Sequence, residues 1–252
     1  MLKYEKIIEE LNKIGIKPPK IIYYDETDST NTRAKEYAES EAGRESVVFI
    51  ANSQTAGRGR RGRSFVSNKD AGIYLSILTY PTERGFDVTK ITAEASVALC
   101  RAIEALTDCE IKIKWVNDLY LGGKKIAGIL TEGKIENDGK IAYSVVGMGI
   151  NVYKKAISDE ISGIATSLES ELNDAPDRSK LVAMIIKEFF STDDCYEEYK
   201  SRSVVIGQNV TVIKPTESYT AKVLDINPDY SLELDVDGKV EKLFTGEVSV
   251  KL

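Results

Sequence analysis

The hydrophobic pattern of this chain of 252 residues changes near Val204. Before that point, apolar residues at helical spacing alternate with short apolar runs typical of strands, at 3–14, 47–50, 88–106, 141–146 and 180–199. After it, short alternating segments follow one another, at 210–213, 219–226, 232–236, 240–244 and 248–252. The pattern predicts an α+β domain over residues 1–202, with helices packed on a mixed sheet, and a small β-barrel over residues 203–252.

Composition indicates the cellular compartment of the protein and excludes some classes of catalysis. The chain has three cysteines without metal-ligand spacing, and its N-terminus lacks the apolar core of a signal peptide, so we expect reduced thiols and a cytoplasmic protein. No apolar run approaches the ~18 residues of a membrane helix. Histidine is absent, which excludes Ser-His-Asp and Cys-His catalysis and disfavours a zinc site. The net charge of -6 argues against broad nonspecific binding to nucleic acid.

Residues 57–63 concentrate arginine and glycine directly after a predicted buried strand. Glycine lets the backbone approach a ligand closely, and arginine offers a planar fork of donors that matches carboxylate or phosphate. The segment therefore predicts an anion-binding loop. A flexible basic loop or an RNA-binding arginine-glycine tract is the alternative. The segment lacks the Gly-Lys-Ser/Thr sequence of a P-loop.

Three further segments place polar or small residues at strand ends. Residues 114–118 combine a cation, an amide and a carboxylate, although Asn-Asp is also common in ordinary turns. Lys125 opens a strand in which Ala127 and Gly128 leave space beside the backbone, or it is simply an exposed edge lysine. Residues 147–151 hold two glycines, which indicate a β-bulge or a contact between ligand and backbone. They lack the third glycine of a dinucleotide-binding motif.

The order of five motifs resembles the biotin protein ligase family. The motifs are Asp-Ser-Thr-Asn (28–31), Gly-Arg-Gly-Arg-Arg-Gly-Arg (57–63), Lys-Trp-Val-Asn-Asp-Leu (114–119), Lys-Ile-Ala-Gly-Ile-Leu (125–130) and Gly-Met-Gly-Ile-Asn (147–151). The resemblance is strong from Tyr24 to Asn151. It continues more loosely through 165–168 and through 245–248, which is similar to the end of the family's SH3-like barrel.

The resemblance implies an enzyme that joins biotin to ATP, forming biotinoyl-5′-AMP and pyrophosphate, and then passes biotin to a lysine of a biotin carboxyl carrier domain. It implies a catalytic biotin/ATP-binding domain at 1–202, similar to class II aminoacyl-tRNA synthetases, and an SH3-like barrel at 203–252. Mg²⁺ would bind through the nucleotide, without ligands from the protein. Because only about 20 residues precede the first core strand, we expect a monofunctional ligase without the DNA-binding domain. A homodimer is compatible with the resemblance.

The resemblance also implies three sets of site residues. The biotin contacts would be Ser29, Thr30, Gln54, Gly57, Arg58, Lys125, Gly128, Gly147 and Gly149. The contacts with ATP and the adenylate would be Arg60, Arg63, Phe65, Asn117, Lys125 and Asn151. The catalytic residues would be Lys125, Arg60 and Asp118.

This chemistry needs no histidine, because the attacking biotin carboxylate is already deprotonated near neutral pH. The reaction needs charge neutralisation and in-line positioning of two anions, which arginine and lysine supply. Two departures from the family pattern stand out. Val116 replaces a usual proline, so a looser turn is expected before Asn117, and Phe65 replaces a frequent tryptophan, so less area stacks on adenine and ATP affinity should be lower.

Two other functions fit parts of the sequence. Lipoate–protein ligases share the fold, but they typically carry a His-Asp pair, and this chain has no histidine. An RNA-binding module would use residues 58–63, but it should interleave exposed aromatic residues with the arginines, and only Phe65 lies close by.

Overall fold

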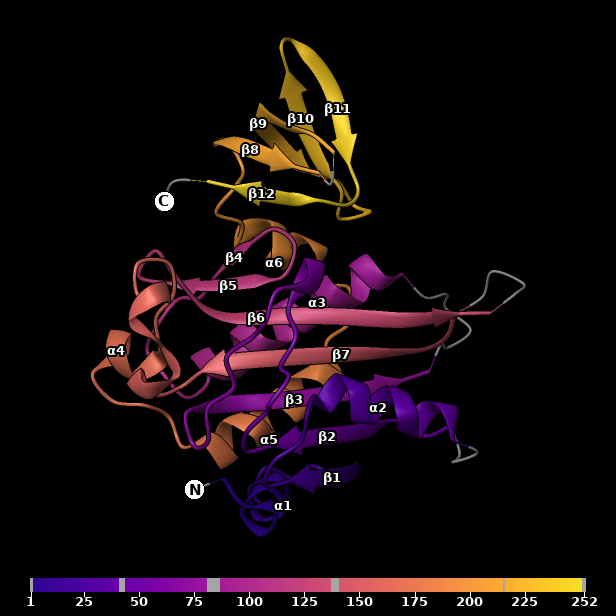
Figure 1. The fold of residues 1–252 in the computed structure, drawn as a ribbon, viewed down its shortest axis with the longest axis vertical. Coiled ribbons are helices and arrows are strands. Elements are labelled where there is room, and N and C mark those ends of the chain that lie inside the picture. The colour runs from indigo at the N-terminus through magenta and orange to yellow at the C-terminus, as the bar shows by residue number, and fades with distance from the viewer. Residues whose placement is uncertain (1, 41–43, 81–86, 137–140, 215, 251–252) are drawn as a thin grey trace.

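The structure is a computed structural model that describes residues 2–40, 44–80, 87–136, 141–214 and 216–250. Two sheets organise the chain (Figure 1). The larger sheet has the strand order β1-β2-β3-β7-β6-β5-β4, and the smaller has the order β11-β10-β9-β8-β12. The smaller sheet lies beyond the β4–β5 edge of the larger sheet, at the top of the view.

The elements have the following bounds. The helices are α1 Tyr4–Lys13, α2 Thr30–Glu39, α3 Val88–Glu104, α4 Leu168–Leu172, α5 Arg178–Ser191 and α6 Tyr196–Ser201, with short 3-10 turns η1 Arg60–Gly62, η2 Lys154–Ala156 and η3 Asp159–Ile161. The strands of the larger sheet are β1 Lys20–Tyr24, β2 Val47–Ala51, β3 Gly72–Thr79, β4 Lys112–Lys114, β5 Asp118–Leu121, β6 Lys124–Ile135 and β7 Ile141–Asn151. The strands of the smaller sheet are β8 Asn209–Ile213, β9 Ser218–Ile226, β10 Leu232–Val236, β11 Lys239–Leu243 and β12 Glu247–Ser249.

The larger sheet is mixed and is covered on both faces. Strands β1 and β2 are parallel and are joined through α2, while the other neighbouring pairs are antiparallel. Because successive side chains of a strand point to opposite faces of the sheet, the side chains of β2 contribute to both faces. Val47 and Phe49 pack in a small cluster with Ala34 of α2, whereas Val48 and Ile50 belong to the main core shared with α3 and α5. The pocket described below opens on the α2 face.

The main core continues from the larger sheet into the smaller one. The indole of Trp115 donates a hydrogen bond to the carbonyl of Tyr230 at 2.8 Å, and the ring of Tyr199 packs edge-on against the Tyr230 ring at 5.4 Å. Lys200 of α6 forms an ion pair with Asp225 of β9 at 2.6 Å. The predicted domain boundary at 202/203 falls just after α6, and the division into two domains stays a prediction.

Most predicted elements form within a residue or two of their expected bounds, and four differ. The strand predicted over 125–130 runs on to Ile135, because β7 pairs with it along its length. The helix predicted over 180–199 is interrupted between Ser191 and Tyr196. The C-cap residue Thr192 is extended, which ends α5, and Asp194 follows with a positive φ of 36°. The strand predicted to end at 146 runs to Asn151, because β3 and β6 pair with it on both sides. The last predicted strand, 248–252, is shorter, and residues 251–252 lie outside the described part of the chain.

The barrel prediction is confirmed only in part. The five strands form one antiparallel sheet, as the alternating pattern predicts. Within the described residues, its end strands β11 and β12 do not pair with each other, so the hydrogen bonding does not close into a barrel. No helix in the described ranges has the length and apolarity needed to span a membrane.

One buried cation ties α5 to the larger sheet. Arg178, at the first turn of α5, is 4% exposed. Its guanidinium donates to the side chain of Asn52 at 3.2 Å and to the carbonyl of Gly72 at 3.0 Å, and it forms an ion pair with Asp70 at 2.8 Å. These partners lie at the ends of β2 and β3, so the arginine fixes the strand ends next to the loop that carries residues 57–63.

Arg178→Ala should lower the free energy of unfolding by about 3 kcal/mol or more, because it leaves Asp70 and the Gly72 carbonyl without their buried partner. Urea unfolding would measure the change. The control is Lys180→Ala, an exposed position on the same helix, which should cost less than about 0.5 kcal/mol. Equal stability of the two variants would contradict a structural role for the arginine.

Candidate active site

One row of cross-strand partners forms the floor of a trough in the larger sheet. Lys114, Asp118, Gly128 and Gly149 lie directly opposite one another in β4, β5, β6 and β7. Directly paired residues project on the same face of a sheet. The two glycines leave the β6–β7 half of the row without side chains, while the β5–β4 half carries charged groups. A cavity lies over this floor.

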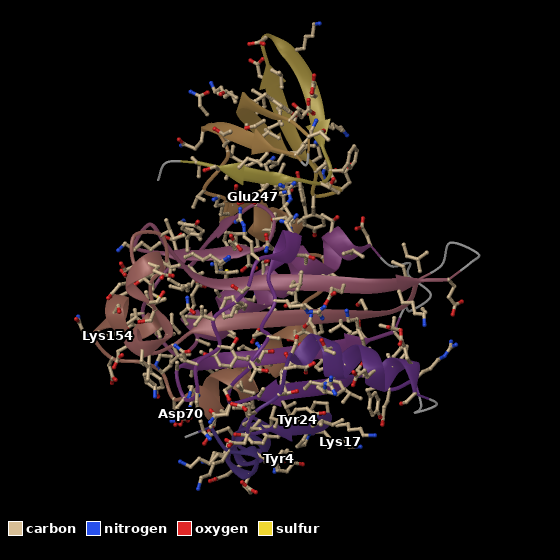
Figure 2. The ribbon with its side chains drawn as sticks, in the orientation of Figure 1. Tyr4, Lys17, Tyr24, Asp70, Lys154 and Glu247 are labelled. Atoms are coloured by element: carbon tan, nitrogen blue, oxygen red, sulfur yellow. The ribbon has the colours of Figure 1, made fainter. Side chains whose placement is uncertain are left out.

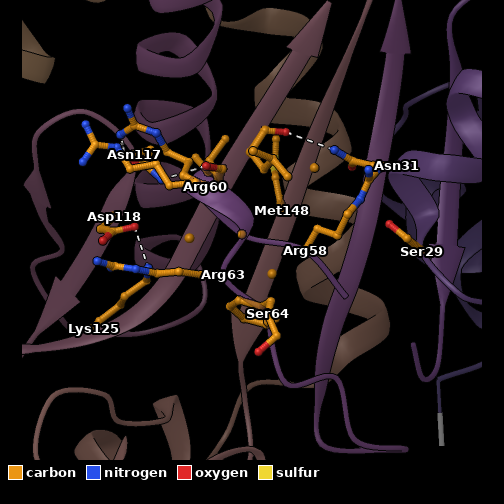
Figure 3. A pocket seen from close by; sticks show the side chains of 18 of the residues that line it. Ser29, Asn31, Arg58, Arg60, Arg63, Ser64, Asn117, Asp118, Lys125 and Met148 are labelled. Atoms are coloured by element: carbon orange, nitrogen blue, oxygen red, sulfur yellow. Dashed lines mark hydrogen bonds and ion pairs between the residues drawn. The ribbon is translucent and has the colours of Figure 1, made fainter. Parts of the chain in front are cut away.

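The cavity brings together almost all of the predicted site residues. Those that line it are Ser29, Thr30, Gln54, Arg58, Arg60, Arg63, Phe65, Asn117, Asp118, Lys125, Gly128, Gly147 and Gly149. Figure 3 shows Ser29 on one side of the pocket, with Arg60, Asn117, Asp118 and Lys125 on the other. The pocket therefore has an uncharged polar end beside α2 and a charged end beside β5.

Two predicted residues do not line the cavity. The carbonyl of Gly57 accepts a hydrogen bond from the amide of Phe65 at 2.9 Å, and a Cβ on Gly57 would stand 2.3 Å from the Phe65 carbonyl oxygen. A side chain at 57 would thus prevent the loop from folding back on itself. Asn151 is buried at the end of β7, where its amide donates to the carbonyl of Thr166 at 3.3 Å.

Hydrogen bonds fix the uncharged end of the pocket. The side-chain carbonyl of Gln54 accepts from the Thr30 amide at 2.8 Å and from its hydroxyl at 3.1 Å. The amide nitrogen of Gln54 donates to Ser67 at 2.8 Å. Ser29 occupies the N-cap position of α2 but makes no capping hydrogen bond with its side chain. Its hydroxyl lies on the pocket wall, where a polar ligand could bond to it.

Asn31 lines the same end, although it was not among the predicted site residues. Its Oδ1 would lie 2.2 Å from a Cβ on Gly147, so the glycine makes room for this amide. The Asn31 amide nitrogen donates to Glu132 at 2.9 Å, and Ser76 bonds its Oδ1 at 2.5 Å. The Asp-Ser-Thr-Asn motif contained this residue, but only the folded chain places it against Gly147.

An ion pair dominates the charged end. The Lys125 ammonium lies 2.6 Å from Asp118 Oδ1, an oxygen that is buried and has no other partner among the described residues. A Cβ on Gly128 would lie 3.1 Å from the Lys125 nitrogen, so this glycine leaves space for the lysine. The backbone of Lys125 is held by Ile164 and Thr166, which leaves its side chain directed at the trough.

Arg60 is held by neutral oxygens. Its guanidinium donates to Asn117 Oδ1 at 2.8 Å and to the Gly246 carbonyl at 3.0 Å. Burial lowers the pKa of Arg60, and the nearby Asp118 carboxylate opposes that effect. Arginine nonetheless stays protonated in proteins. Because no carboxylate is bonded to it within the described residues, its charge is available to an anionic ligand.

Hydrogen bonds hold the turn before Asn117, where a looser turn was expected from Val116. Val116 is buried, and its carbonyl accepts a hydrogen bond from the Tyr199 hydroxyl at 3.0 Å. The Asn117 amide nitrogen donates to the Ile129 carbonyl at 2.8 Å, and the Ile129 amide donates to the Asn117 carbonyl at 2.9 Å. These bonds fix the turn. The peptide bond between Trp115 and Val116 is cis.

The remaining two arginines of the predicted site form ion pairs. Arg58 lies 3.2 Å from Glu132, which also receives Lys35 at 2.9 Å. Arg63 lies 2.9 Å from Glu247 of β12, where the small sheet meets the large one (Figure 2). Glu132 and Glu247 were not among the predicted site residues, because nothing local in the sequence signals these long-range pairings.

Phe65 lies over the glycine floor. A Cβ on Gly149 would stand 2.6 Å from its ring, and the ring packs edge-on against Tyr74 at 6.3 Å. Gly149 is therefore required for the position of this ring as well as for the shape of the trough. An aromatic face at this point can stack on a planar heterocycle.

The site contains several cations and no nucleophilic triad. Within the described residues, no group of three or more His, Cys, Asp or Glu side chains could hold a metal ion. The arrangement can bind a ligand with an uncharged polar head and an anionic tail, and it can neutralise a second anion beside that tail.

Comparisons with known proteins agree with this geometry. A model of the biotin/lipoate A/B protein ligase family matches residues 23–151. The chain is 30% identical over 244 residues to the bifunctional ligase/repressor BirA of Bacillus spizizenii, a match that covers 91% of this chain and 74% of that protein. It is also 30% identical to a biotin–[acetyl-CoA-carboxylase] ligase of Mycobacterium tuberculosis, covering 88% of this chain and 86% of that protein.

Solved structures give the same result. The biotin protein ligase from Aquifex aeolicus in complex with biotin and ATP matches with a TM-score of 0.77 at 25% identity, over 91% of this chain and 97% of that chain. The matched region in the family model includes both ends of the trough and the loop at 57–63. The chain belongs to the biotin/lipoate A/B protein ligase family.

Proposed function

We propose that this protein is an ATP-dependent biotin protein ligase that forms biotinoyl-5′-AMP and transfers the biotinoyl group to a lysine of a biotin carboxyl carrier domain. The observation that carries this proposal is the polarity of the trough. Uncharged hydrogen-bonding groups at Ser29, Thr30 and Gln54 suit the ureido ring, and Lys125, at the charged end of the same cavity, would bind the biotin carboxylate. The solved relative that binds biotin and ATP supports this direction.

In the first step, an oxygen of the biotin carboxylate bonds to the α-phosphorus of ATP. The bond from that phosphorus to the bridging oxygen breaks, and its electron pair leaves with pyrophosphate. No proton is transferred, so no general base is required. Lys125 and Arg60 would neutralise the two anions and hold them in line, which supplies most of the rate enhancement in such a displacement. Phe65 and Asn117 would contact the nucleotide.

In the second step, the carrier lysine must attack the biotinoyl carbonyl as a free amine, although its reference pKa is about 10.4. The new amide bond forms as the bond from the carbonyl carbon to the phosphate oxygen breaks, and AMP leaves with that electron pair. Asp118 would orient the amine and take its proton. The ion pair between Asp118 and Lys125 at 2.6 Å supports this role, because it would keep the Asp118 carboxylate next to the lysine that binds the biotin carboxyl group.

Three finer assignments belong to the same proposal. Mg²⁺ would accompany the nucleotide and bind mainly through the triphosphate, as magnesium usually does. The small sheet would correspond to the SH3-like domain of the family, with the boundary at 202/203. The positions Gly57 and Asn151 would act indirectly, Gly57 by letting the loop fold and Asn151 by holding the segment at Thr166.

Biotin-dependent exchange of labelled pyrophosphate into ATP tests the proposed function. The protein should exchange label only when biotin is present, because exchange requires reversible formation of the adenylate. Lipoate is the control substrate. Exchange driven by lipoate and not by biotin would replace the proposal with a lipoate ligase, and no exchange with either acid would reject it.

Lys125→Ala should slow biotin-dependent exchange by about 100-fold or more, the usual effect of removing one preorganised charge from a transition state. Lys124→Ala is the matched control, because Lys124 lies next in the same strand but its ammonium bonds the Ser162 carbonyl at 2.9 Å, away from the pocket. Equal exchange rates for the two variants, with unchanged far-ultraviolet circular dichroism, would show that Lys125 has no role in adenylation.

Arg60→Gly should leave adenylate formation measurable but let biotinoyl-AMP escape, because the guanidinium that bonds Asn117 and Gly246 would no longer hold the phosphate. Biotin should then appear on bystander proteins, which a streptavidin blot of a mixture containing serum albumin would detect. Arg44→Gly is the control, because it removes the same charge at an exposed residue that does not line the pocket. Labelling that stays confined to the carrier in Arg60→Gly would contradict the retention role.

A further inference from the structure

Lys114 is a cation of the pocket that neither the predicted site nor the proposed mechanism uses. It is the last residue of β4 and lines the cavity. Its ammonium lies over the ring of Tyr120, 5.7 Å from the centroid. Within the described residues, the Lys114 ammonium forms no ion pair with a carboxylate and donates no hydrogen bond to a carbonyl or hydroxyl oxygen.

Apart from Arg61, which lines the cavity from an exposed position in the loop, the other cations around the trough are already bonded. Arg58 is paired with Glu132, Arg63 with Glu247 and Lys125 with Asp118, while Arg60 bonds two neutral oxygens. Lys114 has only an aromatic face, which can hold an ammonium without neutralising it. An unpaired positive charge beside a ligand cavity favours the binding of an anionic group of the ligand.

The position of Lys114 across the sheet indicates which part of the ligand it meets. The uncharged end of the pocket lies on the far side of β7, where Thr30 bonds Ser76 of β3. Moving across the sheet from there, Gly149 lies on β7, Gly128 on β6, Asp118 on β5 and Lys114 on the edge strand β4. Neighbouring strands are about 4.8 Å apart, so β4 lies roughly 10 Å beyond β6.

In-line displacement then fixes the direction of the leaving group. Under the proposed function, the biotin carboxylate approaches the α-phosphorus from the uncharged, β7 side, with Lys125 on β6 at the reacting atoms. The leaving oxygen departs on the opposite side of the phosphorus from the attacking oxygen, which is the β5–β4 side. The nucleotide base is directed elsewhere, since Phe65 lies over Gly149 of β7.

We propose that Lys114 binds the pyrophosphate that leaves in the adenylation step, and so acts in the first half-reaction but not in the second. The inference rests on the proposed function. As the bond between the α-phosphorus and the bridging oxygen breaks, the electron pair moves onto pyrophosphate, and the Lys114 ammonium lies where that charge develops. Transfer from biotinoyl-AMP to the carrier lysine releases AMP and involves no pyrophosphate.

The electrostatic surroundings of Lys114 agree with this role. Burial lowers the pKa of its ammonium, and the carboxylates of Asp118 and Glu247 oppose that effect while Lys125 and Arg63 add to it. The two carboxylates would repel pyrophosphate if they were unpaired, but each is already bonded to one of these two cations. An anion beside Lys114 stabilises the charged form of the lysine. Bound pyrophosphate would therefore keep Lys114 protonated, and the protonated lysine would in turn stabilise bound pyrophosphate.

The experiment measures adenylation and biotin transfer separately in the variant Lys114→Gln. The KM for pyrophosphate in biotin-dependent exchange should rise about tenfold or more, as expected for the loss of one hydrogen bond between charged groups. The rate of biotin transfer from chemically synthesised biotinoyl-AMP to the carrier should stay within about twofold of the wild-type rate. Lys114→Arg should restore most of the affinity for pyrophosphate, because it keeps the charge.

Lys112→Gln is the matched control, since Lys112 lies two residues earlier on β4 and pairs with Glu110 outside the pocket. The binding constant for biotin and the thermal unfolding midpoint of each variant show whether the pocket stays intact. An unchanged KM for pyrophosphate in Lys114→Gln, or an equal loss of transfer from biotinoyl-AMP, would overturn the role of Lys114. Failure of the wild-type protein to exchange at all would instead reject the proposed function.

Discussion

The site depends on the absence of side chains at two adjacent points of the large sheet. Gly128 and Gly149 lie directly opposite each other in β6 and β7. A Cβ on Gly128 would press on Lys125, and a Cβ on Gly149 would occupy the space of the Phe65 ring. Flat backbone at this point lets a lysine and an aromatic ring lie on the same floor, one on each side of the place where two ligands would meet.

The cations that gather around this floor need carboxylates that offset their charge. Several cations crowd into one pocket of a chain whose net charge is -6, and their mutual repulsion must be offset before a ligand arrives. Carboxylates from three separate elements supply the offset: Asp118 in β5, Glu132 in β6 and Glu247 in β12. Ion pairs that are partly exposed stabilise a fold little. Their effect here is to hold each cation in a defined direction toward the trough.

The resemblance carried by the order of five motifs predicted which segments converge. The motifs stood at strand ends or beside glycines, and cross-strand register brought them over one floor, so most of the proposed site residues line the pocket. Register also explains what could not be predicted. Asn31 against Gly147 and Arg63 against Glu247 join residues far apart in the chain, and no local pattern specifies such pairs. The interruption between α5 and α6 begins at Thr192, which is extended, and helix propensity does not predict that break.

The most consequential of these long-range contacts join the arginine loop to the small sheet. Arg60 donates to the Gly246 carbonyl and Arg63 pairs with Glu247, so two arginines that would hold the adenylate are oriented by residues from beyond the predicted domain boundary. The sequence pattern separates the chain into two units, yet the pocket takes its walls from both, with Glu247 and Val248 among its lining residues. A loop rich in glycine has many conformations available. Anchoring two of its arginines to β12 and the residue before it reduces that freedom, so the small sheet acts as part of the pocket wall.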